Sequence, residues 1–485
     1  MADLLVQAKL VTTDDVAKGL ERMVGSGGRL GDTLVAIGAI DQKVLNDFLH
    51  RIPGEPADIK ATGIDELDLT GLLMKLMYSG RLETCRQFVE AIKLPYPIVI
   101  ELVTMAIDRH LIHSLGTRGS SGPLDLAYSF TEEGKRWTLD ALERLRYIGP
   151  APVAIDDFTF RVNLQKLTNE LITFERIRKA TAELTFEDAL IEQCGPALNS
   201  GRAMLLYGPP GNGKTSVARS MSKVFNDVIY VPYSIIVEGQ IIRVFDPSIH
   251  FPIDPAGLDD DNPLSIVRRE IFDARWVACK RPFVIAGGEL TLDMLDLRYD
   301  ASGHYYEAPL HVKALSGCFI IDDFGRQLVS PTNLLNRWIV PLENRVDFLK
   351  LHTGKTLTIP FEELIIFSTN LEPEDLMDPA FLRRLPYKIE VGPPTKENYR
   401  TIFEKECAVH GFEIPTDIFE TIVHTVTVEK GLELACYQPK FVVDQVVASC
   451  RFMQMPLRFE VRFVKNALDN LRVHRHSPTK TAASV

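Results

Sequence analysis

Long hydrophobic runs are absent from this sequence. No stretch of the 485 residues reaches the roughly 18 uninterrupted apolar residues that a membrane-spanning helix requires, and the apolar run YPIVIELVTMAI is interrupted by Glu101. The first ten residues, MADLLVQAKL, carry an early aspartate and no basic residue ahead of their short apolar run, which is not typical of a signal peptide. We therefore expect no membrane insertion and a cytoplasmic location.

Closely spaced cysteine pairs are absent as well. No C-x-x-C pair occurs, and no histidine stands at a spacing suited to zinc. This scatter argues against a disulfide framework and favours reduced thiols. The seven cysteines are Cys85, Cys194, Cys279, Cys318, Cys407, Cys436 and Cys450.

The sequence also lacks an excess of positive charge. It contains 54 Lys and Arg against 65 Asp and Glu, for a net charge of −11. This balance argues against nonspecific binding of nucleic acid or anionic membranes by the whole surface, although it leaves a local basic patch open. The hydrophobic content of 46% is that of a folded globular protein, and the length allows roughly three domains.

The pattern of the sequence changes several times along the chain. Apolar runs alternate with helical stretches between about 160 and 395, which predicts a parallel α/β sheet. Its strand candidates are Met204–Tyr207, Pro282–Ala286, Gly317–Ile321 and Leu364–Ser368. We predict these segments: a helical module at 1–52, a linker at 53–64, a second unit at 65–147, the α/β core at 148–395, a helical lid at 396–472 and a flexible tail at 473–485.

The central motif is GPPGNGKTS, which fits the phosphate-loop pattern G-x-x-x-x-G-K-[ST] between a predicted strand and a predicted helix. Glycines allow backbone N–H groups to turn inward around phosphates, and the following helix presents its positive end. We expect Lys214 to reach the β- and γ-phosphates and Thr215 to ligate Mg²⁺. The predicted ATP-binding residues of this loop are Gly208, Pro209, Pro210, Gly211, Asn212, Gly213, Lys214, Thr215 and Ser216.

Carboxylates suited to a nucleotide site follow a later strand. GCFIIDD ends in Asp322 and Asp323; we expect Asp322 to hold Mg²⁺ and Asp323 to orient or deprotonate the attacking water. The strand LIIFSTN ends at Asn370, which could hold that water or the γ-phosphate. DPAFLRRL then places Arg383 and Arg384 where a guanidinium could stabilise the charge on a transferring phosphoryl group. A surface salt bridge is the alternative for either arginine.

Taken in order, these motifs are similar to those of the AAA+ ATPases over about residues 165–472. The resemblance implies an α/β fold with a parallel-sheet P-loop core and a helical lid. The predicted fold class places a small helical domain and a winged-helix-like domain ahead of this core. The resemblance also implies that Asn370 is sensor 1 and that Arg383 or Arg384 acts on the neighbouring subunit's nucleotide in a ring, usually a hexamer. YQPKFVVDQV resembles the sensor-2 stretch of MoxR-type members and places Lys440 there, where the family usually has arginine.

The sequence departs from that family pattern at two points. The family's second Walker B acid is generally glutamate, and Asp323 is one methylene shorter, so hydrolysis could be slow. A long segment separates Lys214 from Asp322, and YDASGHYYEAPLHVKALSG within it resembles the inserted elements of the helix-two-insert clade. Tyr305 and Tyr306 in this segment either face a central pore or pack across strands, with packing favoured.

Residues 65–147 show three helical periods, then a glycine-rich loop between two short strands, then a helix, an order that resembles a winged helix-turn-helix. The best recognition-helix candidate, YPIVIELVTMAIDRHLI, offers only Arg109 as a permanent cation, offset by Glu101 and Asp108. A helix that reads a DNA groove normally carries several basic or amide side chains. We therefore favour protein docking, with DNA binding as the alternative.

The N-terminal segment RLGDTLVAIGAI resembles the cyclic di-GMP-binding motif of the MshEN type, found on type II secretion and type IV pilus ATPases. The resemblance implies that arginine meets a guanine and that the leucines and glycines pack the ligand; the matching positions are Arg29, Leu30, Gly31, Leu34 and Gly38. The motif occurs convincingly once rather than twice, and Ile52 replaces the closing glutamine. The alternative is a helical docking module without the ligand.

The sequence thus predicts an ATP-binding and ATP-hydrolysing enzyme with Mg²⁺ as cofactor, which remodels or assembles a protein partner and is open to regulation by cyclic di-GMP. Two alternatives remain. One is an ATP-dependent transcription regulator that binds DNA through residues 65–147. The other is an ATP-bound assembly switch with little hydrolysis, for which Asp323 is the motivating residue.

Overall fold

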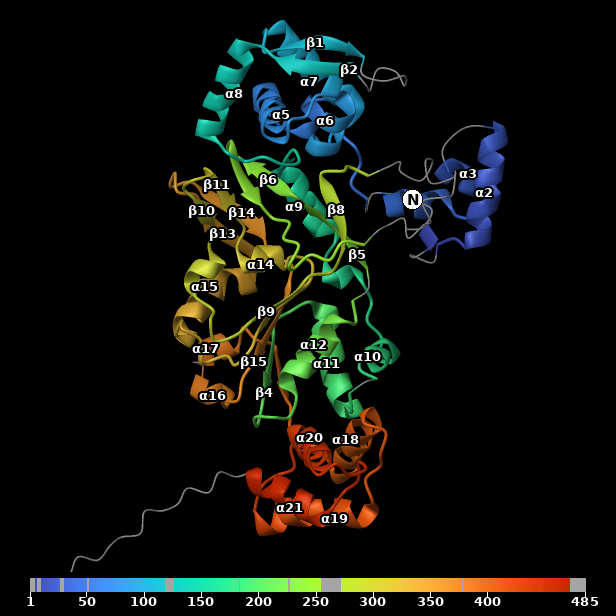
Figure 1. Ribbon diagram of the computed structural model, residues 1–485, viewed down its shortest axis with the longest axis vertical. Coiled ribbons are helices and arrows are strands. Elements are labelled where there is room, and N and C mark those ends of the chain that lie inside the picture. The colour runs from blue at the N-terminus through green and yellow to red at the C-terminus, as the bar shows by residue number, and fades with distance from the viewer. Residues whose placement is uncertain are drawn as a thin grey trace, which may run out of the picture.

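The computed structural model describes residues 5–6, 10–26, 30–49, 52–117, 126–182, 184–225, 227–253, 272–376 and 379–471. The molecule is elongated, with the α5–α8 unit at one end, the helical lid at the other and the α/β core between them (Figure 1). The N-terminal helices α2 and α3 lie to one side of this column. Among the described residues, no helix has the length and hydropathy needed to cross a bilayer.

A parallel sheet of five strands forms the centre of the core, in the order β16-β4-β15-β12-β9. All four neighbouring pairs are parallel. Four of these strands lie within the runs predicted from the sequence, and the predicted α/β fold class is confirmed. The strands are β4 (Met204–Tyr207), β9 (Phe283–Ala286), β12 (Cys318–Ile321), β15 (Leu364–Ser368) and β16 (Tyr387–Glu390).

Both faces of this sheet are covered, because successive side chains of each strand point to opposite sides. In β4, Met204 and Leu206 pack into one apolar cluster with Val217 of a covering helix, whereas Leu205 packs into another with Trp338. This explains why the strands read as continuous apolar runs. The helices of the core are α9 (Ile155–Leu164), α10 (Phe174–Ala180), α11 (Asp188–Ser200), α12 (Lys214–Ser222), α14 (Leu310–Lys313), α15 (Pro331–Asn344), α16 (Pro373–Leu376) and α17 (Pro379–Leu382), with short 3₁₀ turns η3 (Leu167–Asn169) and η4 (Leu292–Leu295).

A second, mixed sheet lies between the core and the α5–α8 unit, and the sequence analysis did not predict it. Its order is β10-β11-β7-β6-β3. Tyr306 is buried there, and the Tyr305 ring meets Tyr147 edge-on with centroids 6.1 Å apart, which bears out the packing interpretation of the tyrosine pair. The strands are β3 (Val153–Ala154), β6 (Ser234–Val237), β7 (Gln240–Arg243), β10 (Arg298–Asp300) and β11 (Tyr305–Glu307); separate antiparallel pairs are β5 (Val228–Pro232) with β8 (Trp276–Lys280) and β13 (Val346–Lys350) with β14 (Thr356–Pro360).

The unit at the end of the molecule contains three helices, a hairpin and a closing helix, in the predicted order. Side chains cap its helices: Asp65 accepts from Leu67 N, Thr84 forms a capping box with Gln87, and Thr131 accepts from Gly134 N. These caps satisfy backbone N–H groups that a helix leaves unpaired. The elements are α5 (Glu66–Gly80), α6 (Cys85–Ile92), α7 (Tyr96–Asp108), β1 (Ile112–Thr117), β2 (Leu126–Phe130) and α8 (Glu132–Arg144).

The N-terminal module and the lid are helical throughout their described parts. The module comprises α2 (Thr13–Ser26), α3 (Leu30–Ala36) and α4 (Gln42–Leu49), which share a core that includes Leu5, Leu20 and Leu34. The lid comprises α18 (Lys396–Val409), α19 (Thr416–His424), the π-helical turn η5 (Thr425–Glu429), α20 (Tyr437–Phe452) and α21 (Val461–Asn470), packed around a cluster that contains Tyr399 and Phe403.

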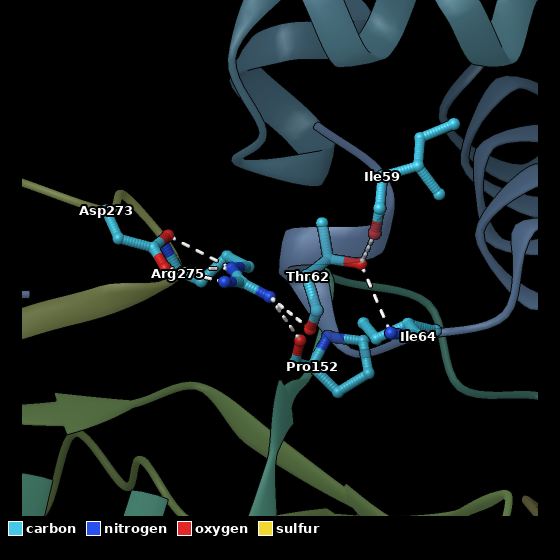
Figure 2. Close-up of polar contacts among 6 residues, drawn as sticks. All are labelled: Ile59, Thr62, Ile64, Pro152, Asp273 and Arg275. Carbon is cyan, nitrogen blue, oxygen red and sulfur yellow. Dashed lines mark hydrogen bonds and ion pairs between the residues drawn. The ribbon is translucent and has the colours of Figure 1, made fainter. Parts of the chain in front are cut away.

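The two segments that flank the α5–α8 unit, one before α5 and one after α8, form the joints of this unit and are themselves ordered. The short turn η1 (Lys60–Thr62) lies in the first, and Thr62 is fully buried. Figure 2 shows how the Arg275 guanidinium connects both joints: Nη1 donates to Pro152 O at 3.0 Å and to Thr62 O at 3.5 Å, while Nη2 pairs with Asp273 Oδ2 at 2.7 Å. Arg275 and Asp273 are both almost completely buried, so this cluster fixes the joints to the core.

Candidate functional site: a nucleotide cleft between sheet and lid

The phosphate loop connects β4 to α12, as the sequence predicts, and its glycines adopt conformations that other residues rarely take. Gly208, Gly211 and Gly213 have φ values of +135°, +83° and +84°. A Cβ atom on Gly208 would lie 2.7 Å from Val391 O. The left-handed Gly213 directly precedes α12, so the N–H groups of the first turn of that helix open toward the loop.

Lys214 begins α12, and its side chain turns back into the loop. Its ammonium donates to Gly208 O at 2.9 Å and to Pro209 O at 2.8 Å, and the residue is 6% exposed. Burial lowers the pKa of the Lys214 ammonium, while the carboxylates of Asp323 and Asp322 act in the opposite direction. The ammonium therefore lies at the centre of the loop, where phosphates are expected.

Thr215 and Asp322 meet although 107 residues separate them. The Thr215 hydroxyl donates to Asp322 Oδ1 at 2.9 Å and is 3.0 Å from Oδ2. Asp322 directly follows β12, and its N–H donates to Ala286 O at the end of β9, which fixes its backbone. A hydroxyl and a carboxylate at this spacing form the oxygen-donor set that Mg²⁺ prefers, so the residues present fit the expected ion. Within the described ranges, no cluster of three His, Cys, Asp or Glu residues forms a metal site of its own.

Asp323 and Asn370 also meet, from the ends of neighbouring strands. Asn370 Nδ2 donates to Asp323 Oδ1 at 2.8 Å. Asp323 has φ +51°, a left-handed conformation that turns its side chain away from the line of β12. Gln327 Nε2 donates to the carbonyls of Asp322 and Asp323 at 2.7 and 3.1 Å and holds this turn. The sequence analysis missed Gln327, because only the folded turn brings its amide onto these carbonyls.

The lid closes the site from the side opposite the sheet. Tyr437 N donates to Gly211 O at 3.0 Å, and Cys436 N donates to Asn212 Oδ1 at 3.4 Å. The cleft that results has a volume of about 700 Å³. Its lining comprises Leu184, Thr185, Phe186, Pro210, Gly211, Asn212, Gly213, Lys214, Thr215, Ser216, Asp322, Asp323, Ser368, Asn370, Ile402, Lys405, Glu406, Cys436, Tyr437, Lys440, Phe441 and Asp444.

Several residues of that lining carry no sequence signal of their own. Leu184 and Phe186 come from the segment before α11 and add apolar surface beside the loop. Lys405 of the lid donates to the carbonyls of Ala182 and Leu184 and so joins that segment to the lid. Apolar residues in an irregular segment are common, and only their position in the fold identifies them as part of the cleft.

Lys440 lies in the cleft lining on α20, but it is paired. Its ammonium is 3.0 Å from Asp444 Oδ2 one helical turn later, and both side chains are about half exposed. The hydrogen bond that Lys440 donates to the Asp444 carboxylate raises the pKa of Lys440. A phosphate contact of Lys440 therefore requires the lysine to leave this carboxylate.

Arg383 and Arg384 follow α17 and do not line the cleft. Arg384 Nε donates to Glu343 Oε1 at 2.5 Å, so this guanidinium is held by α15 of the same chain. Arg383 is exposed and, among the described residues, its guanidinium makes no ion pair or hydrogen bond. Of the two arginines, Arg383 is the one free to reach outward.

Four residues of the N-terminal motif lie in α3 or directly after it. Arg29 lies outside the described residues, and Leu30 and Gly31 begin α3. Leu34 is completely buried in the module's own core, and Gly38 forms a left-handed turn after α3, where an added Cβ would meet no atom within 4 Å. Ile52 packs into the cluster that contains β5 and β8 rather than against the motif.

Comparisons with known proteins agree with an ATPase core. A family model described as a domain of unknown function, DUF8689, matches residues 395–470, the lid. A proteasome-activating nucleotidase from Methanoculleus marisnigri is 28% identical over 298 residues, which cover 58% of this chain and 69% of that relative. This similarity supports a relationship to the AAA+ ATPases.

Solved structures also resemble the chain. They include a RuvB mutant from Thermotoga maritima (15% identity, TM-score 0.31, covering 63% of this chain and 72% of that one) and the FIGL-1 AAA domain in complex with ADP (15% identity, TM-score 0.30, covering 56% and 72%). These TM-scores are too low to carry an argument, so the assignment of the fold rests on the parallel sheet of the chain itself.

Proposed function

We propose that this protein is a Mg²⁺-dependent AAA+ ATPase that assembles into a ring and remodels a protein partner. One observation carries the proposal: the phosphate loop, both aspartates after β12 and the amide after β15 converge on one cleft under the lid. Hydrogen bonds join Thr215 to Asp322 and Asn370 to Asp323 across it. Nothing in the packing of the core requires this combination of polar groups.

Each residue then has a distinct role. The loop N–H groups and the Lys214 ammonium bind the β- and γ-phosphates, and Thr215 and Asp322 hold the metal ion. Bound there, Mg²⁺ would neutralise charge that develops on the phosphate oxygens. Asp323 accepts a proton from the attacking water, and Asn370 fixes the direction of that carboxylate.

The proposed ring follows from the position of Arg383. A guanidinium that is exposed and outside the cleft can stabilise phosphoryl transfer only in a neighbouring subunit's cleft. The pairing of Arg384 with Glu343 favours Arg383 over Arg384 in this role. A hexamer is the ring size proposed, by resemblance to the family.

We propose that residues 1–147 bind the protein partner. The helix α7 offers few cations for DNA, and Leu34 of the cyclic di-GMP-like motif is used by the module's own core. Both observations favour docking over a nucleotide second messenger or a DNA site. Equilibrium dialysis with cyclic di-GMP and salt-dependent DNA binding test the alternatives; saturable cyclic di-GMP binding would contradict the docking assignment.

A second candidate, an ATP-bound switch with little turnover, is favoured by one observation. Asp323 is a short side chain whose Oδ1 already accepts from Asn370, which leaves fewer oxygen positions for a water. In that case ATP binding would drive assembly, and hydrolysis would be negligible at every protein concentration.

A subunit-mixing assay tests the ring ATPase and separates it from the switch. Lys214→Ala and Arg383→Ala should each abolish turnover, whereas Arg202→Ala, at the opposite end of β4, should not. Mixing the two inactive variants should restore part of the activity, because a Lys214→Ala subunit still supplies Arg383 to an intact loop in its neighbour. Turnover that is absent in the wild type would favour the switch; inactive mixtures of variants that still assemble would exclude a finger acting between subunits.

A further inference from the structure

A second pocket, of about 330 Å³, lies between the α5–α8 unit and the β6–β7 hairpin. In Figure 1 this is the junction between the labels α5, α8 and β6. Helix α5 contributes Asp68, Leu72 and Lys75, which the spacing of an α-helix places on one face. Helix α8 contributes Trp137 and Arg144 in the same way. The volume is at the lower end of the range of about 300–1,000 Å³ that is typical of small-molecule sites, and domain junctions are a common place for them.

The most buried charged side chain of this pocket is that of Lys75. The residue is 4% exposed, and among the described residues its ammonium makes a single hydrogen bond, to Leu145 O at 3.0 Å. An ammonium has three N–H donors, so two remain for a ligand. Burial lowers the pKa of Lys75 to about 8, against the opposing influence of Asp68, and leaves the group charged at neutral pH. A buried charge with unused donors is costly unless an anion compensates it.

The walls of the pocket are mainly apolar. The Trp137 ring lies against α5 at Gly71, where a Cβ would be 3.6 Å from the ring, and Leu72 and Ile241 add aliphatic surface. The charged side chains of the lining are three cations and one carboxylate, a net charge of +2: Lys75, Arg109, Arg144 and Asp68. Apolar walls with a cationic end complement a molecule with an apolar body and an acidic group.

We infer that this pocket binds a small amphipathic anion, with its acidic group on the Lys75 ammonium and its apolar, preferably aromatic, body against Trp137. The exposed guanidinium groups of Arg109 and Arg144 draw the anion to the opening. This site is separate from the nucleotide cleft and shares no lining residue with it.

The position of the pocket gives its occupant a mechanical consequence. Ile64 and Pro152 belong to the lining, and they adjoin the joints that Arg275 holds (Figure 2). Ile236 and Ile241 of the lining belong to β6 and β7 of the second sheet. A bound anion therefore touches the α5–α8 unit, both joints and the core at once, and stabilises the docking of the unit on the core.

Two dyes of matched shape test the charge and the apolar body separately. 8-Anilinonaphthalene-1-sulfonate carries an acidic group, and N-phenyl-1-naphthylamine has the same aromatic skeleton without it. The fluorescence of each is titrated with the full-length protein in excess ADP, which keeps the dyes from the nucleotide cleft. We expect the sulfonate to bind at least about tenfold more tightly, a difference of about 1.4 kcal/mol. Equal affinities, or no saturable sulfonate binding in the presence of ADP, would overturn the proposal.

Variants assign the signal to this pocket. Lys75→Met should weaken sulfonate binding about tenfold and leave the neutral dye within about twofold, and Trp137→Ala should weaken both. Lys135→Met is the matched control, because Lys135 lies on α8 but pairs with Glu132 at the surface. If Lys75→Met fails to fold, the exposed change Arg144→Gln decides: selectively weaker sulfonate binding supports the site, and unchanged binding of both dyes overturns it.

Discussion

The backbone N–H of Tyr437 donates a hydrogen bond to the carbonyl oxygen of Gly211, with nitrogen and oxygen 3.0 Å apart. Tyr437 is the first residue of lid helix α20, and Gly211 stands in the middle of the phosphate loop. The conformation of the loop and the position of the lid are therefore fixed by the same contact. A ligand that moves either one moves the other.

Replacing Gly211 with alanine should disturb both. Gly211 has φ +83°, and a Cβ there would lie 2.3 Å from Tyr437 Cδ1, far inside van der Waals contact. We expect Gly211→Ala to raise the Kd for ATP by about tenfold or more, equivalent to about 1.4 kcal/mol. Titration of the protein with a fluorescent ATP analogue measures it.

Two further variants identify the cause. Gly392→Ala adds a Cβ to open space at ordinary φ and should leave ATP affinity unchanged. Adding Tyr437→Ala to Gly211→Ala should recover part of the lost affinity by removing the clash. No recovery would mean that backbone strain in the loop, rather than the lid contact, limits binding.

Asp323 should control turnover without controlling binding. Asp323→Asn keeps the shape but removes the base, so we expect kcat to fall by about 100-fold or more with ATP affinity nearly unchanged. Asp323→Glu should retain activity, since it keeps the carboxylate. Steady-state kinetics paired with equilibrium ATP binding distinguish the two effects, and equal loss of binding in Asp323→Asn would contradict the assigned role.

The buried pair of Arg275 and Asp273 should be important for stability. Arg275→Met leaves the Asp273 carboxylate buried without its partner and frees the carbonyls of Thr62 and Pro152, so we expect a loss of about 3–5 kcal/mol in the free energy of unfolding. Urea unfolding measures it. The control is Lys355→Met, which breaks an exposed pair with Glu238 and should cost at most about 1 kcal/mol.

Glu363 should be a destabilising residue at neutral pH. It is completely buried, and neither carboxyl oxygen has a hydrogen-bond partner in the described part of the chain. Burial raises the pKa of Glu363 well above 4.5. The cost of burying the carboxylate is thus fully present above the folded-state pKa and disappears below about 4.5, the unfolded value.

We therefore expect Glu363→Met to be more stable than the wild type by about 1–3 kcal/mol at pH 7, with the advantage shrinking toward pH 4. Urea unfolding across this range checks it. The neighbouring change Glu362→Met should do the opposite, because Glu362 is paired with Lys166 at 2.8 Å. An advantage of Glu363→Met that does not depend on pH would point to packing rather than charge.

The sequence predicted the residues whose chemistry is local. The loop from Gly208 to Thr215 depends on glycine conformations and on an adjacent helix, and both can be recognised in a short window. Asp322, Asp323 and Asn370 were predicted to serve one nucleotide site because each follows a predicted strand, and the hydrogen bonds across the cleft bring them together.

Contacts between distant segments could not be predicted in this way. The second sheet pairs β3, at Val153, with β6, at Ile235, and a two-residue strand has no periodicity to detect. Tyr437 acts through its backbone N–H, so its side-chain type carries no information, and Gln327 donates to carbonyls that only the folded turn brings near its amide. For Lys440 the sequence position predicted a phosphate contact, but the structure pairs its ammonium with the Asp444 carboxylate.

The pairing of β3 with β6 bears on how the chain can be divided into fragments. A cut near residue 148, where the sequence changes character, would leave Tyr147 on one piece and its hydrogen-bond partner Ser234, 2.8 Å away, on the other. The same cut would separate Ala151, whose N–H donates to Ile92 O, from the piece that contains Ile92. The folding units thus overlap along the chain. A fragment of the ATPase core that begins after β3 would leave the edge of β6 unpaired, and an unpaired strand edge favours aggregation. A fragment that begins ahead of η1 retains β3 and keeps that edge paired.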